Sequence, residues 1–311
     1  MQTTIAKPAS TSGVGLHTGC QVSITLRPAP PRTGIVFRRV DLHGFEIEAR
    51  RKWVSRVVLA TTLMKRGVML STVEHVLSAI YGCGIDNLYV DIDSLELPIL
   101  DGSARPFVEL IEAAGIAEQS AERTFLVVER TVRLEERGKF VMIEPSDQLS
   151  ISYAIDFDHP AIGRQSIDLV LTRKSYTQEI AFARTFGFYR EVEDLRRKGL
   201  IRGGSLENAV VLDESGVMNG ELRAPDEFVR HKVLDLIGDV SLCGFPLLGR
   251  ITAYRAGHSL HTNLATKISR SEGTVRRVAE EIALQSAAVH GHLLHTPLLG
   301  ERRRPERKRE K

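Results

Sequence analysis

One predicted helix, residues 226–243, constrains the fold of this chain more than any other feature. His231, Asp235 and Asp239 follow one another at intervals of four residues, which places them about 40° apart around a helix axis. Almost all other positions of this segment are apolar, so the helix should be buried over most of its circumference. Buried histidine and aspartate side chains require a hydrogen-bonding partner or a metal ion. The chain must therefore bring a second polar element against this face.

Residues 71–75, which read STVEH, can supply that second element. A hydrolytic zinc site uses three protein ligands and leaves one position for water. His231 and Asp235 can provide two ligands from one helix face, and His75 is the best candidate for the third. Glu74 beside it could take the proton of a water molecule whose pKa zinc lowers to about 7.

The same residues also have ordinary structural interpretations. Ser71 and Glu74 have the spacing of a capping box, in which Glu74 would only bond the Ser71 amide. His231 and Asp235 could form a simple helix pair. Spacing alone leaves both interpretations open beside the metal site.

Two other histidine-containing segments are weaker candidates. Residues 13–19 (GVGLHTG) lack the spacing of a dinucleotide-binding loop and precede a strand instead of a helix. A predicted helix over residues 271–288 is followed by the densest histidine cluster, His290, His292 and His295. Histidine is favourable at the C-terminus of a helix, and no acidic base adjoins the cluster, which favours a structural role. The absence of HExxH excludes the familiar zinc-protease arrangement.

Two further residues could contribute to catalysis. His258 lies in a predicted loop after a strand, where a histidine can act as an acid, as a charged stabiliser or not at all. Thr185 offers a hydroxyl group that could face a developing oxyanion. Spacing does not decide either role.

The order of predicted elements indicates an α+β fold in two halves. Strands are expected at residues 21–26, 34–37, 87–93, 125–134, 139–144, 149–157 and 249–254. Helices are expected at residues 71–83 and 104–114, in addition to those at 226–243 and 271–288. The polar segment 117–123 reads as a linker. This order predicts a domain of residues 1–120, which supplies Glu74 and His75, and a domain of residues 121–298, which supplies His231, Asp235 and His258.

Two segments fall outside this regular order. Residues 186–212 are interpreted as an insertion, a suitable place for an element that shapes a substrate site. Residues 299–311 form a basic tail that we expect to be disordered. Residues 301–311 carry a surplus of four positive charges in a chain of net charge +3, so the rest of the chain carries about −1. Nucleic-acid binding by the folded body is therefore not supported, whereas the tail could contact an acidic surface such as a membrane.

Composition indicates a globular cytoplasmic protein. The chain is 42% hydrophobic and 26% charged, and it has no apolar run approaching the ~20 residues of a membrane span. No secretory signal is visible at the N-terminus. Cys20, Cys83 and Cys243 show no paired spacing, which is typical of free thiols in a reducing compartment.

Several motifs, taken in order, resemble those of the UDP-3-O-acyl-N-acetylglucosamine deacetylases, the zinc amidases of lipid A synthesis in Gram-negative bacteria. The motifs are SGVGLHTG at 12–19, STVEH at 71–75, GIDN at 84–87, ELPILDGSA at 96–104, ARTFGF at 183–188, GGSLENA at 203–209, residues 228–239 and the Gly-His pair at 257–258. The resemblance extends to about residue 263 and leaves only the C-terminal region unmatched.

The resemblance implies a role for each site residue. His75, His231 and Asp235 would hold one zinc ion per chain, although iron(II) also suits these ligands. Glu74 would be the general base and His258 its protonated partner. Two further roles are implied for residues around them: Asp239 would hydrogen-bond His258, and Thr185 would face the oxyanion.

The resemblance also implies where the substrate lies. Lys232 would lie near the polar end of the substrate, and Phe186 is assigned to substrate binding as well. Phe157 resembles an aromatic residue on which the uracil stacks, but it could equally be a core phenylalanine. Many relatives carry lysine where this chain has Arg255, a position implied to meet the nucleotide phosphates, so hydrogen-bond geometry there should differ.

The implied fold consists of two similar layered α/β-sandwich domains with the site between them and an insertion in each. The insertion at 187–211 would form an apolar passage for the acyl chain. The implied reaction hydrolyses the N-acetyl group of UDP-3-O-acyl-N-acetylglucosamine and releases acetate, the committed step of lipid A synthesis. Two alternatives stay open: a metal-dependent hydrolase for another N-acyl sugar, and a non-enzymatic binder that uses its basic tail.

Overall fold

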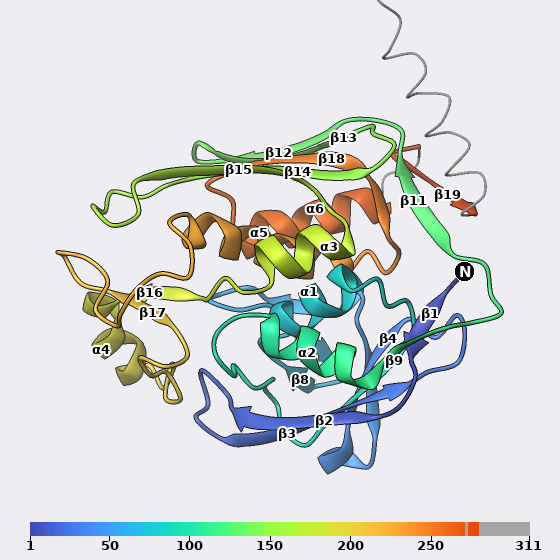
Figure 1. The fold of residues 1–311 in the computed structure, drawn as a ribbon, viewed down its shortest axis with the longest axis horizontal. Helices are drawn as coiled ribbons and strands as arrows, with labels where there is room; N and C mark the ends of the chain where they lie inside the picture. The colour runs from blue at the N-terminus through green and yellow to red at the C-terminus, as the bar shows by residue number, and fades with distance from the viewer. Residues whose placement is uncertain (271–272, 280–311) are drawn as a thin grey trace, which may run out of the picture.

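A computed structural model describes residues 1–270 and 273–279, and it shows an α+β fold (Figure 1). Two larger sheets lie on opposite sides of the molecule, with helices between them. The predicted fold class is therefore confirmed. The strands of one sheet all come from residues before 93, and those of the other all come from residues after 123. A division into two domains near residue 120 stays a prediction.

The first sheet contains five strands in the order β2 (Ala9–Val14), β3 (Gln21–Pro28), β9 (Leu88–Ile92), β4 (Ile35–Arg39) and β5 (Phe45–Glu48). All neighbours are antiparallel except β4 and β9. Alternate residues of β3 are buried, as expected for a strand with one face on the core. Helices α1 (Glu74–Gly82) and α2 (Arg105–Ala114) lie on the inner side of this sheet (Figure 1).

Smaller strand groups complete the first half of the chain. Strands β6 (Val54–Arg56), β7 (Thr62–Lys65) and β8 (Val68–Leu70) form a three-stranded sheet. Strand β1 (Thr3–Ile5) pairs with β10 (Ile116–Glu118). The predicted linker at 117–123 therefore begins inside a strand, because the N-terminal segment returns to pair with it. Two short 3-10 helices lie nearby in the chain: η1 (Val40–Leu42) connects β4 to β5, and η2 (Arg51–Trp53) connects β5 to β6.

The second sheet contains seven strands. Strands β12 (Val132–Glu136), β13 (Lys139–Glu144), β18 (Leu247–Tyr254), β11 (Thr124–Val128) and β19 (Val275–Ala279) follow one another, and β14 (Leu149–Asp156) pairs with both β18 and the outer strand β15 (Arg164–Val170). The strand predicted at 125–134 is thus two strands. The strand predicted at 139–144 is confirmed at both ends.

Helices of the second half cover the inner side of this sheet. Helix α5 (Glu227–Ser241) confirms the predicted helix, and α6 (His258–Arg270) packs beside it. The short helix α3 (Arg173–Ser175) continues into the π-helix η3 (Tyr176–Ile180). Strands β16 (Phe186–Phe188) and β17 (Val210–Leu212) pair in parallel and carry α4 (Tyr189–Arg197) between them, within the predicted insertion.

Helices α1 and α5 pack against each other in the centre of the molecule (Figure 1). Nearly all of the side chains of both helices are buried. For α5 this burial was predicted from its apolar circumference. Helix α1 ends at Gly82, and Gly84 follows with a φ of +77°, a left-handed conformation that favours glycine after a helix. The central helix pair is therefore the shared core beneath both sheets.

Two predictions near the C-terminus are wrong where the structure describes them. Residues 275–279 form strand β19 instead of part of a helix, because they pair with β11 at the sheet edge. His258 is the first residue of α6 instead of a loop residue. The rest of the helix predicted at 271–288, the histidines at 290, 292 and 295, and the tail at 299–311 lie outside the described residues.

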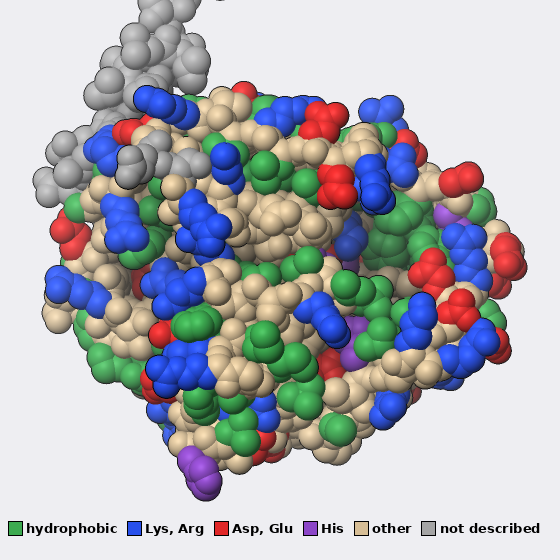
Figure 2. Space-filling model, turned by 180° about the vertical axis from the view of Figure 1, so that it is seen from behind, with side chains coloured by type: hydrophobic (Ala, Val, Ile, Leu, Met, Phe, Trp, Pro, Cys, Tyr) green, Lys and Arg blue, Asp and Glu red, His purple; other side chains and the backbone are tan. Residues whose placement is uncertain are grey.

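The surface carries charges of both signs. In the view from behind, acidic side chains stand among the lysine and arginine side chains, with apolar side chains between them (Figure 2). Within residues 1–270 and 273–279, no helix has the length and apolar character needed to cross a membrane.

Candidate metal centre and catalytic site

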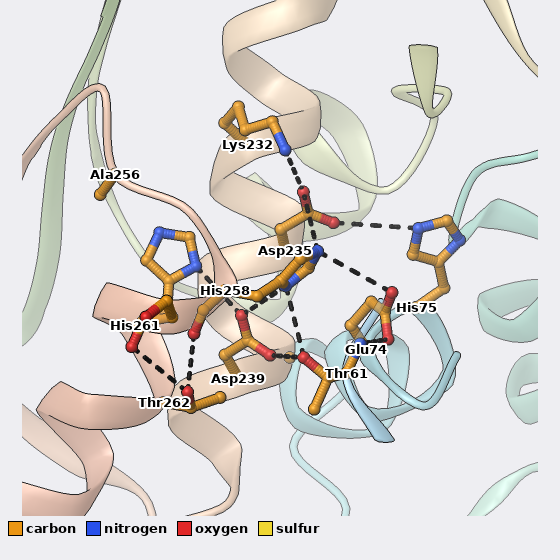
Figure 3. A network of polar contacts seen from close by, with 12 residues as sticks. Thr61, Glu74, His75, Lys232, Asp235, Asp239, Ala256, His258, His261 and Thr262 are labelled. Carbon is orange, nitrogen blue, oxygen red and sulfur yellow. Dashed lines mark hydrogen bonds and ion pairs between the residues drawn. The ribbon is translucent and has the colours of Figure 1, made fainter. Parts of the chain in front are cut away.

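Helices α1 and α5 bring His75, His231 and Asp235 together in the buried core. Figure 3 shows His75 of α1 opposite Asp235 of α5. The Oδ1 atom of Asp235 lies 3.4 Å from His231 Nε2 and 3.9 Å from His75 Nε2. One donor atom from each residue lies within 4.8 Å of the other two. The predicted stripe on α5 therefore meets the predicted third residue from α1.

The donor set has the protonation that a metal ion requires. The His231 Nδ1 atom lies 3.0 Å from the carbonyl oxygen of Ala183, so a proton on Nδ1 leaves the Nε2 lone pair free toward the cluster. Burial, followed by the proximity of the His231 ring, lowers the pKa of His75 to about 3, so this ring is neutral. Its Nδ1 is buried and has no hydrogen-bond partner among the described residues.

Asp235 supplies the negative charge of this cluster. Burial by itself would raise the pKa of its carboxyl group, but Lys232 and the surrounding histidines outweigh burial and lower it. Lys232 Nζ donates to Asp235 Oδ2 at 2.8 Å, which leaves Oδ1 facing the two histidines. Two neutral imidazoles and one carboxylate are a donor set that suits zinc or iron(II).

Glu74 is buried beside this cluster with an unusually basic carboxylate. Burial raises its pKa to about 7, and the nearby Asp239 and Asp235 oppose the lowering effect of His258. Its Oε2 accepts a hydrogen bond from the Thr61 backbone amide at 3.0 Å. Helix α1 begins with Val73 as its N-cap and has no side-chain cap, so the capping-box interpretation of Glu74 is wrong.

His258 stands across from Glu74 at the start of α6. Its Nδ1 lies 2.8 Å from Asp239 Oδ2, and its Nε2 lies 3.9 Å from both Glu74 Oε1 and Asp235 Oδ2. Burial would lower the pKa of His258, but these carboxylates, Asp239 first, raise it to about 10. The ring is therefore an imidazolium ion at neutral pH.

The remaining predicted residues border this centre to different degrees. The ring centroid of Phe186 lies 6.3 Å from that of His231 and 5.7 Å from that of Phe157. Lys232 Nζ lies 5.7 Å above the Phe186 ring. Phe157 is thus joined to the site through an aromatic cluster that also contains Phe188.

Thr185 and Arg255 are positioned mainly through their backbones. The amide of Thr185 donates to the Gly102 carbonyl at 2.8 Å, and its own carbonyl accepts from the Val210 amide at 2.8 Å. Arg255 is exposed at the end of β18, with a φ of +50° and an amide that donates to Ala154.

Sequence reasoning missed four residues that support the site. Thr61 donates from its hydroxyl to Asp239 Oδ1 at 2.6 Å, and His261 Nδ1 lies 3.0 Å from Asp239 Oδ2. Glu227 accepts hydrogen bonds from Arg184, beside Thr185. The fourth is Tyr153, whose hydroxyl lies 3.0 Å from His261 Nε2. Of these four residues, only His261 could have been predicted from the sequence, because its spacing of three residues from His258 would place both on one helix face.

An α+β fold that buries two histidines and an aspartate beside a further carboxylate defines the class of metal-dependent hydrolase sites. Within that class the chain belongs to the LpxC family, described as UDP-3-O-acyl N-acetylglycosamine deacetylase, whose family model matches residues 2–270. The chain is similar to several curated members of this family, each named UDP-3-O-acyl-N-acetylglucosamine deacetylase.

Three relatives illustrate the extent of the similarity. The relative from Myxococcus xanthus is 47% identical over 306 residues, which cover 96% of this chain and 98% of that protein. The relative from Solibacter usitatus is 50% identical over 269 residues, 86% of this chain and 90% of the relative. A relative from Coxiella burnetii is 48% identical over 271 residues, 86% of this chain and 89% of the relative. The similarity therefore spans nearly the whole of both proteins.

Proposed function

We propose that this chain is a metal-dependent amidohydrolase that removes the N-acetyl group of UDP-3-O-acyl-N-acetylglucosamine. The products are UDP-3-O-acyl-glucosamine and acetate, and the step is the committed step of lipid A synthesis. The observation that carries the proposal is the meeting of Glu74 and His75 of α1 with His231 and Asp235 of α5. Family membership identifies the substrate class.

His75, His231 and Asp235 would hold the metal, and we propose one Zn2+ per chain, with Fe2+ as a chemically suitable substitute. When bound there, the ion would act as a Lewis acid toward the acetamide carbonyl and lower the pKa of a water molecule. Lys232 holds Asp235 by its second oxygen, so the carboxylate presents Oδ1 to the histidines without rotating.

Glu74 would act as the general base. Its pKa of about 7 makes the carboxylate basic enough to accept a proton from water near neutral pH. The amide of Thr61 holds Oε2, so Oε1 is the oxygen that remains free toward the centre. The protein thereby aims a single acceptor atom at the place where the attacking water must lie.

His258 would stabilise or protonate the groups that gain charge. Its Nε2 points toward Glu74 and Asp235, and its Nδ1 is held by Asp239. An imidazolium ion in this position can give a proton to the departing amine or stabilise negative charge that develops on the acetamide oxygen. We propose that the hydroxyl group of Thr185 faces the same acetamide oxygen.

The substrate would extend from Lys232 along the aromatic cluster. Lys232 would meet its polar end, Phe186 and Phe157 would line its path, and Arg255 would meet the nucleotide phosphates. The insertion at 187–211 would receive the acyl chain. Its exposed apolar side chains support this assignment, because Tyr189 is 53% and Leu206 is 55% exposed.

The proposal also covers the location, the basic tail and the domain division of the chain. The three cysteines are free thiols, which supports a reducing cytoplasmic location. The basic tail at 299–311 could provide peripheral contact with an acidic membrane surface. We also propose that residues 1–120 and 121–298 are two domains that share the site.

Acetate release from UDP-3-O-acyl-N-acetylglucosamine, measured with and without a chelator, tests the proposal. We expect turnover that the chelator abolishes and that Zn2+ restores. Comparable turnover of unacylated UDP-N-acetylglucosamine would contradict the acyl passage and favour a hydrolase for another N-acyl sugar. A chain truncated after residue 298 should keep nearly normal turnover; loss of all function on truncation would instead favour the non-enzymatic binder.

A further inference from the structure

One fully buried histidine beside the site has no part in the reaction described above. His261 lies on α6, three residues after His258, and its side chain has no exposed surface. Its Nδ1 is 3.0 Å from Asp239 Oδ2, the same oxygen that lies 2.8 Å from His258 Nδ1. Asp239 therefore joins the two imidazole rings through a single carboxylate oxygen (Figure 3).

The other oxygen of Asp239 is held as well. The hydroxyl of Thr61 donates to Oδ1 at 2.6 Å. Asp239 is itself fully buried, so neither oxygen can turn to solvent. The carboxylate thus has three partners, and the direction in which it meets His258 depends on all of them.

The far side of His261 is held by Tyr153 of β14. The tyrosine hydroxyl lies 3.0 Å from His261 Nε2 and 2.9 Å from the carbonyl oxygen of Ala256. The two rings meet edge to face, with centroids 5.9 Å apart. Burial raises the pKa of Tyr153 well above its ordinary range, so the hydroxyl keeps its proton and can donate it to one of these two acceptors.

The positions of the protons follow from what each group can donate. An ionised carboxylate only accepts, so His261 must carry a proton on Nδ1 to bond Asp239. The charged groups facing His261 are Asp239 and Asp235 of α5 and His258 of α6. Burial lowers the pKa of His261, which favours a neutral ring. The lone pair on Nε2 of a neutral His261 and the carbonyl oxygen of Ala256 then compete for the single proton of the Tyr153 hydroxyl.

We propose that His261 is a positioning residue: neutral and protonated on Nδ1, it aims the Asp239 carboxylate at His258, while the Tyr153 hydroxyl supports the far side of its ring. The inference rests on the proposed function of His258. The proposal adds a series of buried contacts that runs from Tyr153 of β14 through His261 of α6 and Asp239 of α5 to the His258 ring. His261 acts only through Asp239 and touches no reacting atom.

Nitrogen-15 NMR of the histidine side chains, recorded on the zinc-loaded enzyme without substrate, tests the tautomer directly. The His261 signals, assigned by their loss in His261→Asn, should show a neutral ring with its proton on Nδ1. In Tyr153→Phe the ring should keep this tautomer, because the Asp239 carboxylate still only accepts. A proton on Nε2 alone, or a doubly protonated ring, would overturn the inference. Because no turnover is needed, this outcome is independent of whether the proposed deacetylation is correct.

Steady-state kinetics test the positioning role. His261→Leu removes the donor to Asp239 and should lower kcat by about 10- to 100-fold, the usual effect of losing a supporting hydrogen bond around a metal site. KM should stay unchanged, because His261 does not touch substrate. His261→Asn keeps an N–H group near the place of Nδ1 and should restore most of the loss.

Metal content and circular dichroism provide the controls for these variants. Equal rates for the leucine and asparagine variants would overturn the inference, as would a loss explained wholly by missing zinc. If the leucine variant does not fold, Tyr153→Phe takes its place. It should lower kcat without changing KM, and an unchanged kcat in that variant would also overturn the inference.

Discussion

Gly238 of α5 lies so close to Glu74 of α1 that no side chain fits between the two helices. A Cβ atom at residue 238 would stand 2.2 Å from the carbonyl oxygen of Glu74, well inside van der Waals contact. This contact brings the middle of α5 against the first turn of α1, where the chain presents Glu74 and His75. The geometry of the proposed metal ligands on both helices therefore depends on one glycine.

Gly238→Ala should separate the two helices and weaken the site. Overpacking of this kind costs about 1–3 kcal/mol of stability, and a displacement of about 1 Å at a catalytic centre can cost about 100-fold in rate. We expect a lower Tm, weaker zinc retention and a lower kcat. Gly216→Ala is the matched control, because residue 216 has no heavy atom within 4 Å of an added Cβ. Wild-type stability and rate in Gly238→Ala would show that the helices can separate without cost.

Glu74→Gln should abolish general-base catalysis without removing the metal. Glutamine keeps an oxygen for the Thr61 amide but cannot accept the water proton, so kcat should fall by about 100- to 10,000-fold. Zinc content, measured by elemental analysis, should stay near one per chain because Glu74 is not a ligand. Glu109→Gln, on the exposed side of α2, serves as the control. Full activity in Glu74→Gln would remove the base from the mechanism.

Asp239→Asn should shift the pH dependence of kcat. Asp239 is the strongest of the influences that raise the pKa of His258, so its loss should lower that pKa. The imidazolium form then persists only to a lower pH, so the alkaline limb of the plot of kcat against pH should move to lower pH. The rate at the optimum should fall as well, because His258 loses its hydrogen-bond partner. An alkaline limb that stays in place would mean that another group controls it.

The Arg184–Glu227 pair should make stability depend on pH. Glu227 is fully buried and accepts hydrogen bonds from the amide, Nε and Nη2 of Arg184. Burial would raise the pKa of Glu227, but these bonds outweigh it and lower the pKa below its ordinary value. The pair therefore stabilises the fold fully above the unfolded-state pKa of about 4.3, and this contribution is lost as pH falls through the lower folded-state value.

Glu227→Gln leaves Arg184 without its counter-charge and should cost about 3–5 kcal/mol at neutral pH. Denaturant unfolding at pH 7 and below pH 4 measures this, and the difference from wild type should shrink at the lower pH. Glu135→Gln, which breaks an exposed pair with Arg133, should cost less than about 1 kcal/mol at either pH. A pH-independent cost at residue 227 would contradict the proposed ionisation.

Several parts of the site could be predicted because they are local. The i,i+4 spacing of His231 and Asp235 places both on one face wherever a helix forms, and Glu74 and His75 are adjacent in the chain. Apolar residues around α5 indicated that this face would be buried. The helix at 227–241 and the strand at 139–144 were predictable for the same reason, since their periodicity lies within a few residues.

Other parts depended on pairing between distant segments. Strand β19 exists because residues 275–279 add to the edge of β11, almost 150 residues earlier in the chain. The role of Thr61 depends on a hydrogen bond to Asp239, and that of Glu227 on contacts with Arg184. No local sequence pattern predicts such partners, because each contact depends on how whole helices and strands pack against one another.

The stripe of His231, Asp235 and Asp239 was determined by sequence alone, since helical periodicity requires only the residues of one helix. Its division into two candidate ligands, which lie beside His75, and a hydrogen-bond partner for His258 depends on tertiary structure. Gly238 allows α1 to approach α5 at the level of Glu74 and His75, while α6 brings His258 and His261 against Asp239. Spacing sets which side chains share a face, but only close packing between helices decides which groups meet there.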